Sequence, residues 1–244
     1  MQMFFVEPGQ IAGGRAVITG PDVNHIRNVL RMKPGEIVRI SDEKEFCGQC
    51  RIEEISPERV VLAVETQGLS TELPAELVLF QGLPKGDKME WIVQKNTELG
   101  VSRIVPVAMK RSVVKLDARK AAAKAGRWQA IAESAGKQSG RTRLPQVSQV
   151  KTFNDVLTES AEFDLLLLPY ESAEGMEGAR RLLDRAAPGM RIGILIGPEG
   201  GFEPSEIEAA VAAGWQVMSL GRRILRTETA GMALAAALML RLEP

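Results

Sequence analysis

The segment richest in glycine, residues 197–202, follows an apolar stretch and reads Gly-Pro-Glu-Gly-Gly-Phe. Glycine has no Cβ, so its backbone can approach a ligand closely and can adopt positive φ angles. The spacing matches neither the dinucleotide-binding fingerprint nor the phosphate-binding loop of nucleoside triphosphatases. Two interpretations stay open: a backbone cradle for another ligand, or a tight turn that binds nothing.

A second candidate segment, residues 220–230, reads Leu-Gly-Arg-Arg-Ile-Leu-Arg-Thr-Glu-Thr-Ala. It carries three arginines within five residues, followed by two threonines where a helix is expected to begin. Threonine can cap a helix, and the first turn of a helix offers unpaired N–H groups. The segment therefore suits a polar ligand, and simple capping beside a surface arginine cluster is the alternative.

Both segments lie between expected strands and helices. Fully apolar strands that alternate with helices predict a parallel sheet covered on both faces. In such a sheet, ligands bind at the carboxyl ends of the strands. The expected strands that lead into candidate loops are residues 164–169, 190–197 and 216–220.

The first seventy residues have a different pattern. Short apolar or alternating runs are separated by turn signals rich in glycine, proline and acidic residues, which predicts a small β-barrel interrupted by one helix. Residues 67–74 are the best candidate for a linker. We therefore expect a β-rich domain over residues 1–72 and an α/β domain over residues 73–244.

The chain has zero net charge, which by itself argues against a nucleic-acid partner. The charge is unevenly distributed, however: residues 1–72 sum to −3, residues 81–151 to +10 and residues 152–244 to −6. Clustered lysines and arginines suit a surface that faces phosphates. A solvated helix face is the alternative interpretation of the basic section.

Composition excludes several classes of protein. Two cysteines and one histidine are too few for a disulfide framework or an ordinary zinc site. Cys47 and Cys50 form an isolated Cys-x-x-Cys pattern in β-rich sequence, from which we expect neither metal nor redox function. The longest apolar run, residues 230–240, is too short to span a bilayer, and the N-terminal residues do not resemble a secretory signal. We expect a soluble cytoplasmic protein that uses no metal.

Together, the two C-terminal segments resemble the paired motifs of the SPOUT class of S-adenosylmethionine-dependent RNA methyltransferases. The longer segment is most similar to that of the RsmE family. Further matches to this family run along both expected domains, at residues 4–6, 25–31, 95–101, 111–114 and 138–145.

The resemblance implies a PUA-like RNA-binding β-barrel followed by a SPOUT α/β domain with a C-terminal trefoil knot. It also implies a homodimer with the active site at the subunit interface. The family transfers a methyl group from S-adenosylmethionine to N3 of a uridine in 16S ribosomal RNA, so the expected partner is this RNA, within the 30S subunit. Two alternatives remain: a non-catalytic RNA-binding ribosome-assembly protein, or a methyltransferase for another RNA position.

The resemblance also implies the site residues. We expect Arg226 to hydrogen-bond a uracil carbonyl and to stabilise the negative charge of the deprotonated ring. A guanidinium stays protonated in proteins and is a poor proton acceptor. Glu228 is the candidate for that role, and a structural role at the helix N-terminus is the alternative. Leu220, Ile224 and Leu225 would supply an apolar wall for adenine. The expected cofactor-binding residues are Leu168, Pro169, Gly197, Pro198, Glu199, Gly200, Gly201, Leu220, Gly221, Ile224, Leu225, Thr227, Thr229 and Ala230. The expected RNA-binding residues are Arg27, Arg31, Lys85, Arg111, Lys115, Arg141 and Arg143.

Overall fold

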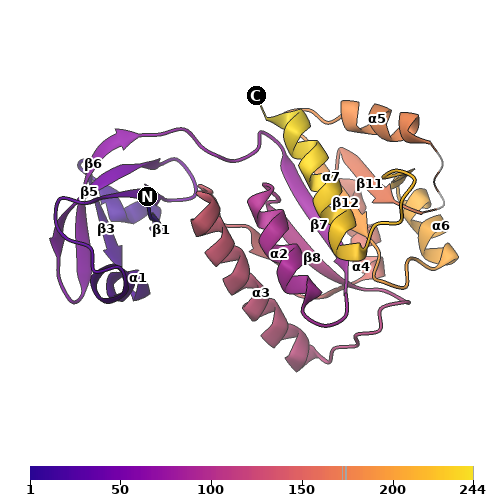
Figure 1. Ribbon diagram of the computed structural model, residues 1–244, viewed down its shortest axis with the longest axis horizontal. Coiled ribbons are helices and arrows are strands. Elements are labelled where there is room, and N and C mark those ends of the chain that lie inside the picture. The colour runs from indigo at the N-terminus through magenta and orange to yellow at the C-terminus, as the bar shows by residue number, and fades with distance from the viewer. Residues whose placement is uncertain (172, 174, 244) are drawn as a thin grey trace. The chain divides into compact units, whose positions relative to one another are not determined.

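The computed structural model describes residues 1–171, 173 and 175–243. The chain divides into two compact units (Figure 1). The first unit comprises residues 1–72 and 136–144, and the second comprises residues 73–135 and 145–244. The first unit thus includes residues 136–144, which we expected in the α/β domain.

The first unit is a curled six-stranded sheet with the strand order β1-β4-β5-β6-β3-β2. Neighbouring strands pair antiparallel, except for β1 and β4, which run parallel. Its strands are β1 (Met3–Phe5), β2 (Ile11–Ala12), β3 (Arg15–Thr19), β4 (Ile37–Ser41), β5 (Cys47–Ile55) and β6 (Arg59–Gln67).

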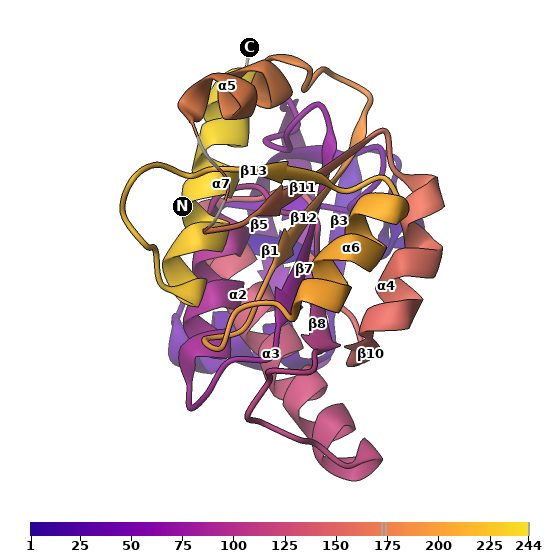
Figure 2. The same ribbon diagram turned by 90° about the vertical axis from the view of Figure 1, so that its right-hand side faces the viewer.

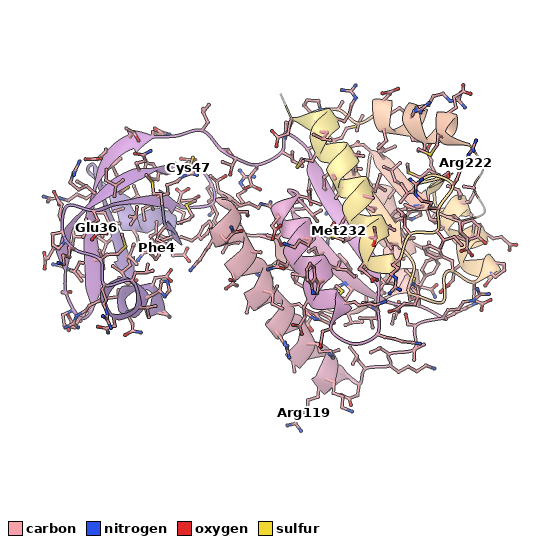
Figure 3. The ribbon with its side chains drawn as sticks, in the orientation of Figure 1. Phe4, Glu36, Cys47, Arg119, Arg222 and Met232 are labelled. Carbon is pink, nitrogen blue, oxygen red and sulfur yellow. The ribbon has the colours of Figure 1, made fainter. Side chains whose placement is uncertain are left out.

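Alternation along these strands creates the core of the first unit, because every second side chain points inward. Phe4, Ile18, Ile40 and Leu62 are all buried there, and Figure 3 shows Phe4 among the enclosed side chains. The expected helix forms as α1 (Pro21–Asn24), continued by a π-helical turn over His25–Val29.

A buried ion pair explains why residues 136–144 belong to the first unit. The guanidinium of Arg141 pairs with the carboxylate of Glu72, and only 5% of Arg141 is exposed. The Oγ of Ser41 donates a hydrogen bond to the carbonyl of Thr142 at 2.6 Å. The charges of Arg141 and Glu72 are therefore paired within the first unit.

The second unit is built on a parallel sheet with the strand order β10-β8-β7-β12-β11-β13, and β9 pairs with β8. Its strands are β7 (Glu76–Gly82), β8 (Arg103–Ala108), β9 (Gln146–Val147), β10 (Lys151–Thr152), β11 (Leu165–Pro169), β12 (Arg191–Ile196) and β13 (Gln216–Met218). The helices are α2 (Lys88–Glu98), α3 (Ala118–Ser139), α4 (Phe153–Glu159), α5 (Met176–Asp184), α6 (Pro204–Ala212) and α7 (Thr227–Leu242). The end of α3, from Gly136 onwards, belongs to the first unit.

Helices cover both faces of this sheet, which explains why its strands are apolar throughout. Leu77 and Leu79 of β7 belong to the core formed with α2, α3, α5 and α7. Val78 and Phe80 of the same strand point to the opposite face, where they pack with side chains of α4 and α6. Figure 2 shows α4 and α6 on one side of the sheet and α2, α5 and α7 on the other.

The strand register places the candidate loops together. Ile196, the last residue of β12, pairs with Gln81, one residue before the end of β7. On the other side of β12, Leu167 of β11 pairs with Ile194, and Pro169 pairs with Met218 at the end of β13. Because all these strands are parallel, the loops that follow them emerge at one edge of the sheet. The trefoil knot stays a prediction.

Candidate active site

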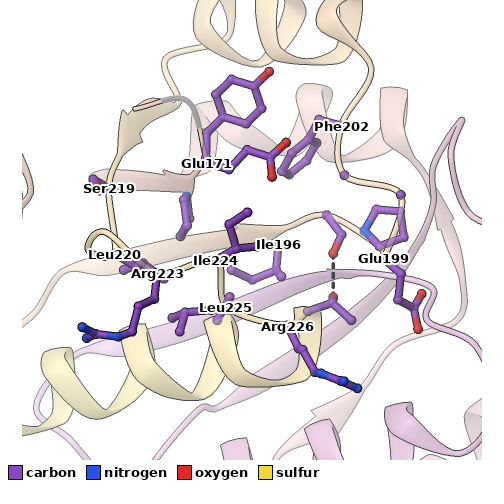
Figure 4. Close-up of a pocket in the computed structure, with 18 of the residues that line it drawn as sticks. Glu171, Ile196, Glu199, Phe202, Ser219, Leu220, Arg223, Ile224, Leu225 and Arg226 are labelled. Atoms are coloured by element: carbon purple, nitrogen blue, oxygen red, sulfur yellow. Dashed lines mark hydrogen bonds between the residues drawn. The ribbon is translucent and has the colours of Figure 1, made fainter. Parts of the chain in front are cut away.

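A cavity of about 450 Å³ opens at the carboxyl edge of the sheet, among the loops that follow β11, β12 and β13 (Figure 4). Glycine backbone, apolar side chains and several charged groups form its wall. The lining residues are Lys88, Pro169, Tyr170, Glu171, Ile196, Gly197, Pro198, Glu199, Gly200, Gly201, Phe202, Ser219, Leu220, Gly221, Arg222, Arg223, Ile224, Leu225, Arg226, Thr227 and Ala230.

The glycine-rich loop after β12 needs its glycines for different reasons. A Cβ at Gly197 would lie 3.1 Å from the ring of Phe202, and Gly201 has a φ of +69°, a conformation that favours glycine. At Gly200, a Cβ would lie 3.0 Å from the Cβ of Arg111, in the loop after β8. The loop is therefore closely packed at two positions and left-handed at a third.

A buried hydroxyl joins this loop to the start of α7. Oγ1 of Thr227 donates a hydrogen bond to the carbonyl oxygen of Gly197 at 2.6 Å, drawn as the dashed line in Figure 4. The same oxygen accepts a hydrogen bond from Nε2 of Gln81 at 2.8 Å. Thr227 thereby links the ends of β7 and β12 to the first residue of α7.

The loop between β13 and α7 supplies the apolar wall of the cavity. Leu220, Ile224 and Leu225 line it, and 82% of Ile224 is exposed. Gly221 has a φ of +111°, so this loop turns at a position where a side chain would be strained. Arg222, labelled in Figure 3, and Arg223 are exposed on the same loop.

One lysine connects the two C-terminal motifs at the cavity wall. Nζ of Lys88 in α2 lies 3.0 Å from a carboxylate oxygen of Glu199 and 3.2 Å from one of Glu228. The carboxylate of Glu199 also accepts a hydrogen bond from the backbone N–H of Lys85 at 3.0 Å. Partial burial raises the pKa of Glu199, but the hydrogen bonds from Lys88 and from backbone N–H groups outweigh it, so the net pKa is lowered. Glu199 is therefore a charged, paired carboxylate.

The structure brings most of the expected cofactor-binding residues into one place. Leu168 is buried in the sheet core, and neither it nor Thr229 belongs to the lining. The other twelve residues line the cavity.

The two expected catalytic residues differ in their placement. Arg226 lines the cavity, is exposed, and caps α7 through its backbone only. In Figure 4 its guanidinium extends away from the apolar side chains of Ile196, Ile224 and Leu225. Glu228 lies outside the lining and pairs with Lys88.

The expected RNA-binding residues fall into two groups. Five of them are exposed and have no carboxylate within ion-pair distance among the described residues: Arg27, Arg31, Lys85, Lys115 and Arg143. The other two are held by carboxylates. Arg141 is buried against Glu72, and Nε of Arg111 lies 2.7 Å from Glu203.

Several lining residues were not among the expected cofactor-binding or catalytic residues: Lys88, Tyr170, Glu171, Ile196, Phe202, Ser219, Arg222 and Arg223. Most of them lie in the same loops as the expected residues, so a prediction that named whole loops as cofactor-binding would have included them. Lys88 is different, because it stands more than one hundred residues before both motifs. Its only signal is its place soon after the apolar stretch that forms β7 of the same sheet.

Two kinds of feature are absent from the described part of the chain. No group of three or more histidine, cysteine, aspartate or glutamate residues there could hold a metal ion. No described helix is both long and apolar enough to cross a membrane.

Comparison with known proteins identifies both units. An RNA methyltransferase domain family matches residues 71–239, and an RNA methyltransferase PUA domain family matches residues 18–65. The ribosomal RNA small subunit methyltransferase E of Bacillus subtilis (strain 168) is 39% identical, over 94% of this chain and 93% of its own. The protein of that name from Synechocystis sp. is 31% identical, over 92% and 73%.

Solved structures agree with these relatives. A crystal structure of a ribosomal RNA small subunit methyltransferase E from Neisseria gonorrhoeae, bound to S-adenosyl methionine, matches with a TM-score of 0.82 and 31% identity. The match covers 98% of this chain and 97% of that one. A putative methyltransferase from Legionella pneumophila, in complex with the same cofactor, also has a TM-score of 0.82, at 29% identity.

These findings confirm the expected fold class, a PUA-like domain followed by a SPOUT-type α/β methyltransferase domain. The family match covers more than half of the chain, and the Bacillus relative aligns with nearly all of it. The chain belongs to the ribosomal RNA small subunit methyltransferase E family.

Proposed function

We propose that this protein methylates N3 of a specific uridine in 16S ribosomal RNA, with S-adenosylmethionine as the methyl donor. The observation that carries the proposal is the cavity where both C-terminal motifs meet at the carboxyl edge of the sheet. Two relatives with solved structures bind the same donor.

The cavity fits this donor in size and chemistry. Its volume of about 450 Å³ lies within the range of small-molecule sites. Ile224 is apolar yet 82% exposed, so a flat adenine ring could cover it. The carboxylate of Glu171 also belongs to the lining, where its charge is opposite to that of a sulfonium or ammonium group.

The bound donor would supply an already activated methyl group. This chain's residues would then have to orient the uridine and stabilise the charge that develops when N3 loses its proton. Holding two reactants in line can contribute about 7–11 kcal/mol to lowering the barrier. Arg226 carries a planar guanidinium at the cavity wall, suited to a uracil carbonyl oxygen. We assign Glu228 a positioning role, because its carboxylate pairs with Lys88 outside the lining.

We propose that the RNA contacts the exposed basic residues that have no described carboxylate within ion-pair distance: Arg27, Arg31, Lys85, Lys115 and Arg143. We also propose that the natural substrate is the 30S subunit in the cytoplasm. Each phosphate contact should add about one unit to the salt slope of binding. Arg141 is left out, because its charge is buried against Glu72.

We also propose a homodimer that uses the outer face of α7. Between Thr229 and Leu240 this helix has no charged residue, yet Ala233 and Leu240 are exposed. A helix that is apolar all round is normally covered on all sides. Trp91 of α2, which packs beside α7, is also 61% exposed and would extend the same apolar surface.

One experiment tests the main proposal. The protein is incubated with S-adenosylmethionine carrying a labelled methyl group and with 30S particles that lack the modification, and the label is then mapped. We expect it at N3 of one uridine in 16S RNA. Label at another base or position would support the alternative of a different RNA methyltransferase. Donor and RNA binding without transfer would support a non-catalytic assembly protein.

A further inference from the structure

Arg111 lies in the loop after β8, far from both C-terminal motifs in sequence, yet it contacts the glycine-rich loop. Its Nε lies 2.7 Å from a carboxylate oxygen of Glu203, and its Nη1 donates a hydrogen bond to the carbonyl oxygen of Gly200 at 3.2 Å. The guanidinium thus binds the loop 197–203 at two points. A planar fork of donors suits such a two-point contact.

The backbones of the two loops are also packed against each other. A Cβ at Gly200 would lie 3.0 Å from Cβ and 3.1 Å from the carbonyl oxygen of Arg111. Next to Arg111, the backbone N–H of Lys110 donates to Glu206 at 3.0 Å, and Nζ of Lys110 donates to Oγ of Ser205 at 2.8 Å. The loop after β8 therefore holds the end of the glycine-rich loop and the start of α6.

On its other side, the glycine-rich loop is held by the loop after β7 and by the first residue of α2. There Glu199 accepts hydrogen bonds from Lys85 and pairs with Lys88. Gly200 and Gly201 line the cavity between these two attachments. The backbone that forms this wall is thus fixed by contacts on both flanks.

We infer that Arg111 is a positioning residue for the methyl-donor site: its guanidinium clamps the Gly200 carbonyl and the Glu203 carboxylate, so that the loop 197–203 is preformed for the donor. This inference rests on the proposed function, because it assumes that the cavity binds S-adenosylmethionine. It replaces the expectation that Arg111 contacts RNA phosphate. A preformed loop binds more tightly because no ordering of the backbone is needed on binding.

The two assignments make opposite predictions for Arg111→Ala. As a clamp, Arg111 affects donor affinity, and we expect the Kd for S-adenosylmethionine to rise about three- to ten-fold in calorimetry. The salt slope for binding an unmodified 16S RNA transcript should stay unchanged. As a phosphate contact, Arg111 would instead add about one unit to that slope and leave the donor Kd unaltered.

Lys115 provides a matched control on the same loop. It is exposed, and no described carboxylate lies within ion-pair distance of it. Lys115→Ala should lower the salt slope for RNA by about one unit and leave the donor Kd unchanged. Arg111→Lys keeps the charge but loses the fork, so its donor Kd should lie between those of the wild type and Arg111→Ala.

The other side of the contact gives an independent check. Glu203→Gln weakens the ion pair with Arg111. If the pair holds the loop, this variant should raise the donor Kd, and the double variant Arg111→Ala/Glu203→Gln should have the same donor Kd as Arg111→Ala alone. If Arg111 bound RNA, removing this competing carboxylate should instead tighten RNA binding. Thermal unfolding of each variant separates loss of the clamp from loss of the fold.

Two results would overturn the inference while leaving the proposed function intact: an unchanged donor Kd in Arg111→Ala, or a donor Kd that rises equally in Lys115→Ala. Failure of the wild type to bind S-adenosylmethionine would contradict the proposed function itself. The two failures are therefore distinguishable in one set of titrations.

Discussion

At the scale of single residues, the site depends on side chains that reach between loops. Thr227 joins Gln81 to Gly197 through one hydroxyl, and Lys88 joins Glu199 to Glu228 through one ammonium group. Arg226 makes no such bridge, because no described carboxylate lies within ion-pair distance of it and only its backbone caps α7. Its guanidinium is therefore available for a substrate.

Arg226→Ala tests this interpretation. Because the side chain takes no part in capping α7, we expect the helix and the donor Kd to change little, the latter by less than about two-fold. The methylation rate should fall by about 10²–10³-fold, the usual effect of losing one donor to a developing negative charge. Single-turnover methylation and calorimetry measure the two quantities separately. A methylation rate near that of the wild type would contradict the assignment.

At the scale of elements, β7 and β12 set the position of the glycine-rich loop. The two strands pair in parallel from Glu76 with Arg191 to Gln81 with Ile196, so the residues that follow them lie against each other. A Cβ at Gly82 would lie 2.6 Å from the backbone nitrogen of Pro198 and 2.7 Å from its Cδ. Only glycine at the end of β7 lets the next loop take this path.

Gly82→Ala should therefore displace Pro198 and the cavity wall beside it. We expect the free energy of unfolding to fall by about 1–3 kcal/mol, as for other overpacked sites, and the donor Kd to rise. Urea unfolding and calorimetry measure the two effects. Gly126→Ala in the exposed part of α3 is the control, because a Cβ added there would meet no atom within 4 Å beyond the neighbouring helix backbone. It should stabilise the helix by about 0.5–1 kcal/mol. Equal behaviour of the two variants would refute the steric argument.

A second element-level contact predicts a pH effect. The carboxylate of Glu159, at the end of α4, pairs with Arg103 of β8 and Lys151 of β10, and its side chain is 9% exposed. Burial raises the pKa of Glu159, but hydrogen bonds from Lys151 and Arg103 outweigh it and lower the net pKa below the ordinary value of 4.5. The group thus binds its proton more readily in the unfolded chain.

With a lowered pKa in the folded state, the contribution of Glu159 is complete above about pH 5 and is lost as the pH falls through the folded-state pKa. Glu159→Gln should lower the free energy of unfolding at pH 7 by about 3 kcal/mol, because it leaves two cations without their partner. The difference between wild type and variant should shrink towards pH 3. Urea unfolding at several pH values measures it, and a difference that is constant with pH would contradict the assignment.

At the scale of the whole molecule, the apolar outer face of α7 predicts self-association. Leu240 lies on this helix and is 76% exposed, and Figure 3 labels Met232 on the same helix. A charge placed on such a face would have to be buried on association, which is unfavourable.

Leu240→Glu should therefore shift the protein from dimer to monomer in sedimentation velocity measurements. Leu69→Glu is a matched control, because Leu69 is 90% exposed but lies outside α7, between β6 and β7. The control should sediment like the wild type. A wild-type protein that is monomeric at micromolar concentration would rule out the proposed dimer.

Much of the fold follows from local sequence. Short apolar runs between turn signals, over residues 37–40 and 60–64, predict the strands β4 and β6, and the longer apolar stretches at 190–197 and 164–169 predict β12 and β11. Glycine and threonine mark the helix ends. These signals are local because the direction of the side chains repeats every two residues in a strand and about every 3.6 residues in a helix. The two C-terminal motifs, and with them the family, are likewise properties of contiguous sequence.

What the sequence by itself determined is thus the succession of elements, the position of the cavity loops and the family. Only the tertiary structure decided which charges are free. Arg111, Arg141 and Lys115 look alike in a basic section of sequence, but Glu203 and Glu72 hold the first two. Lys88 likewise enters the site through partners more than one hundred residues away. Ion pairs between distant segments depend on chain topology, which no local pattern of residues encodes.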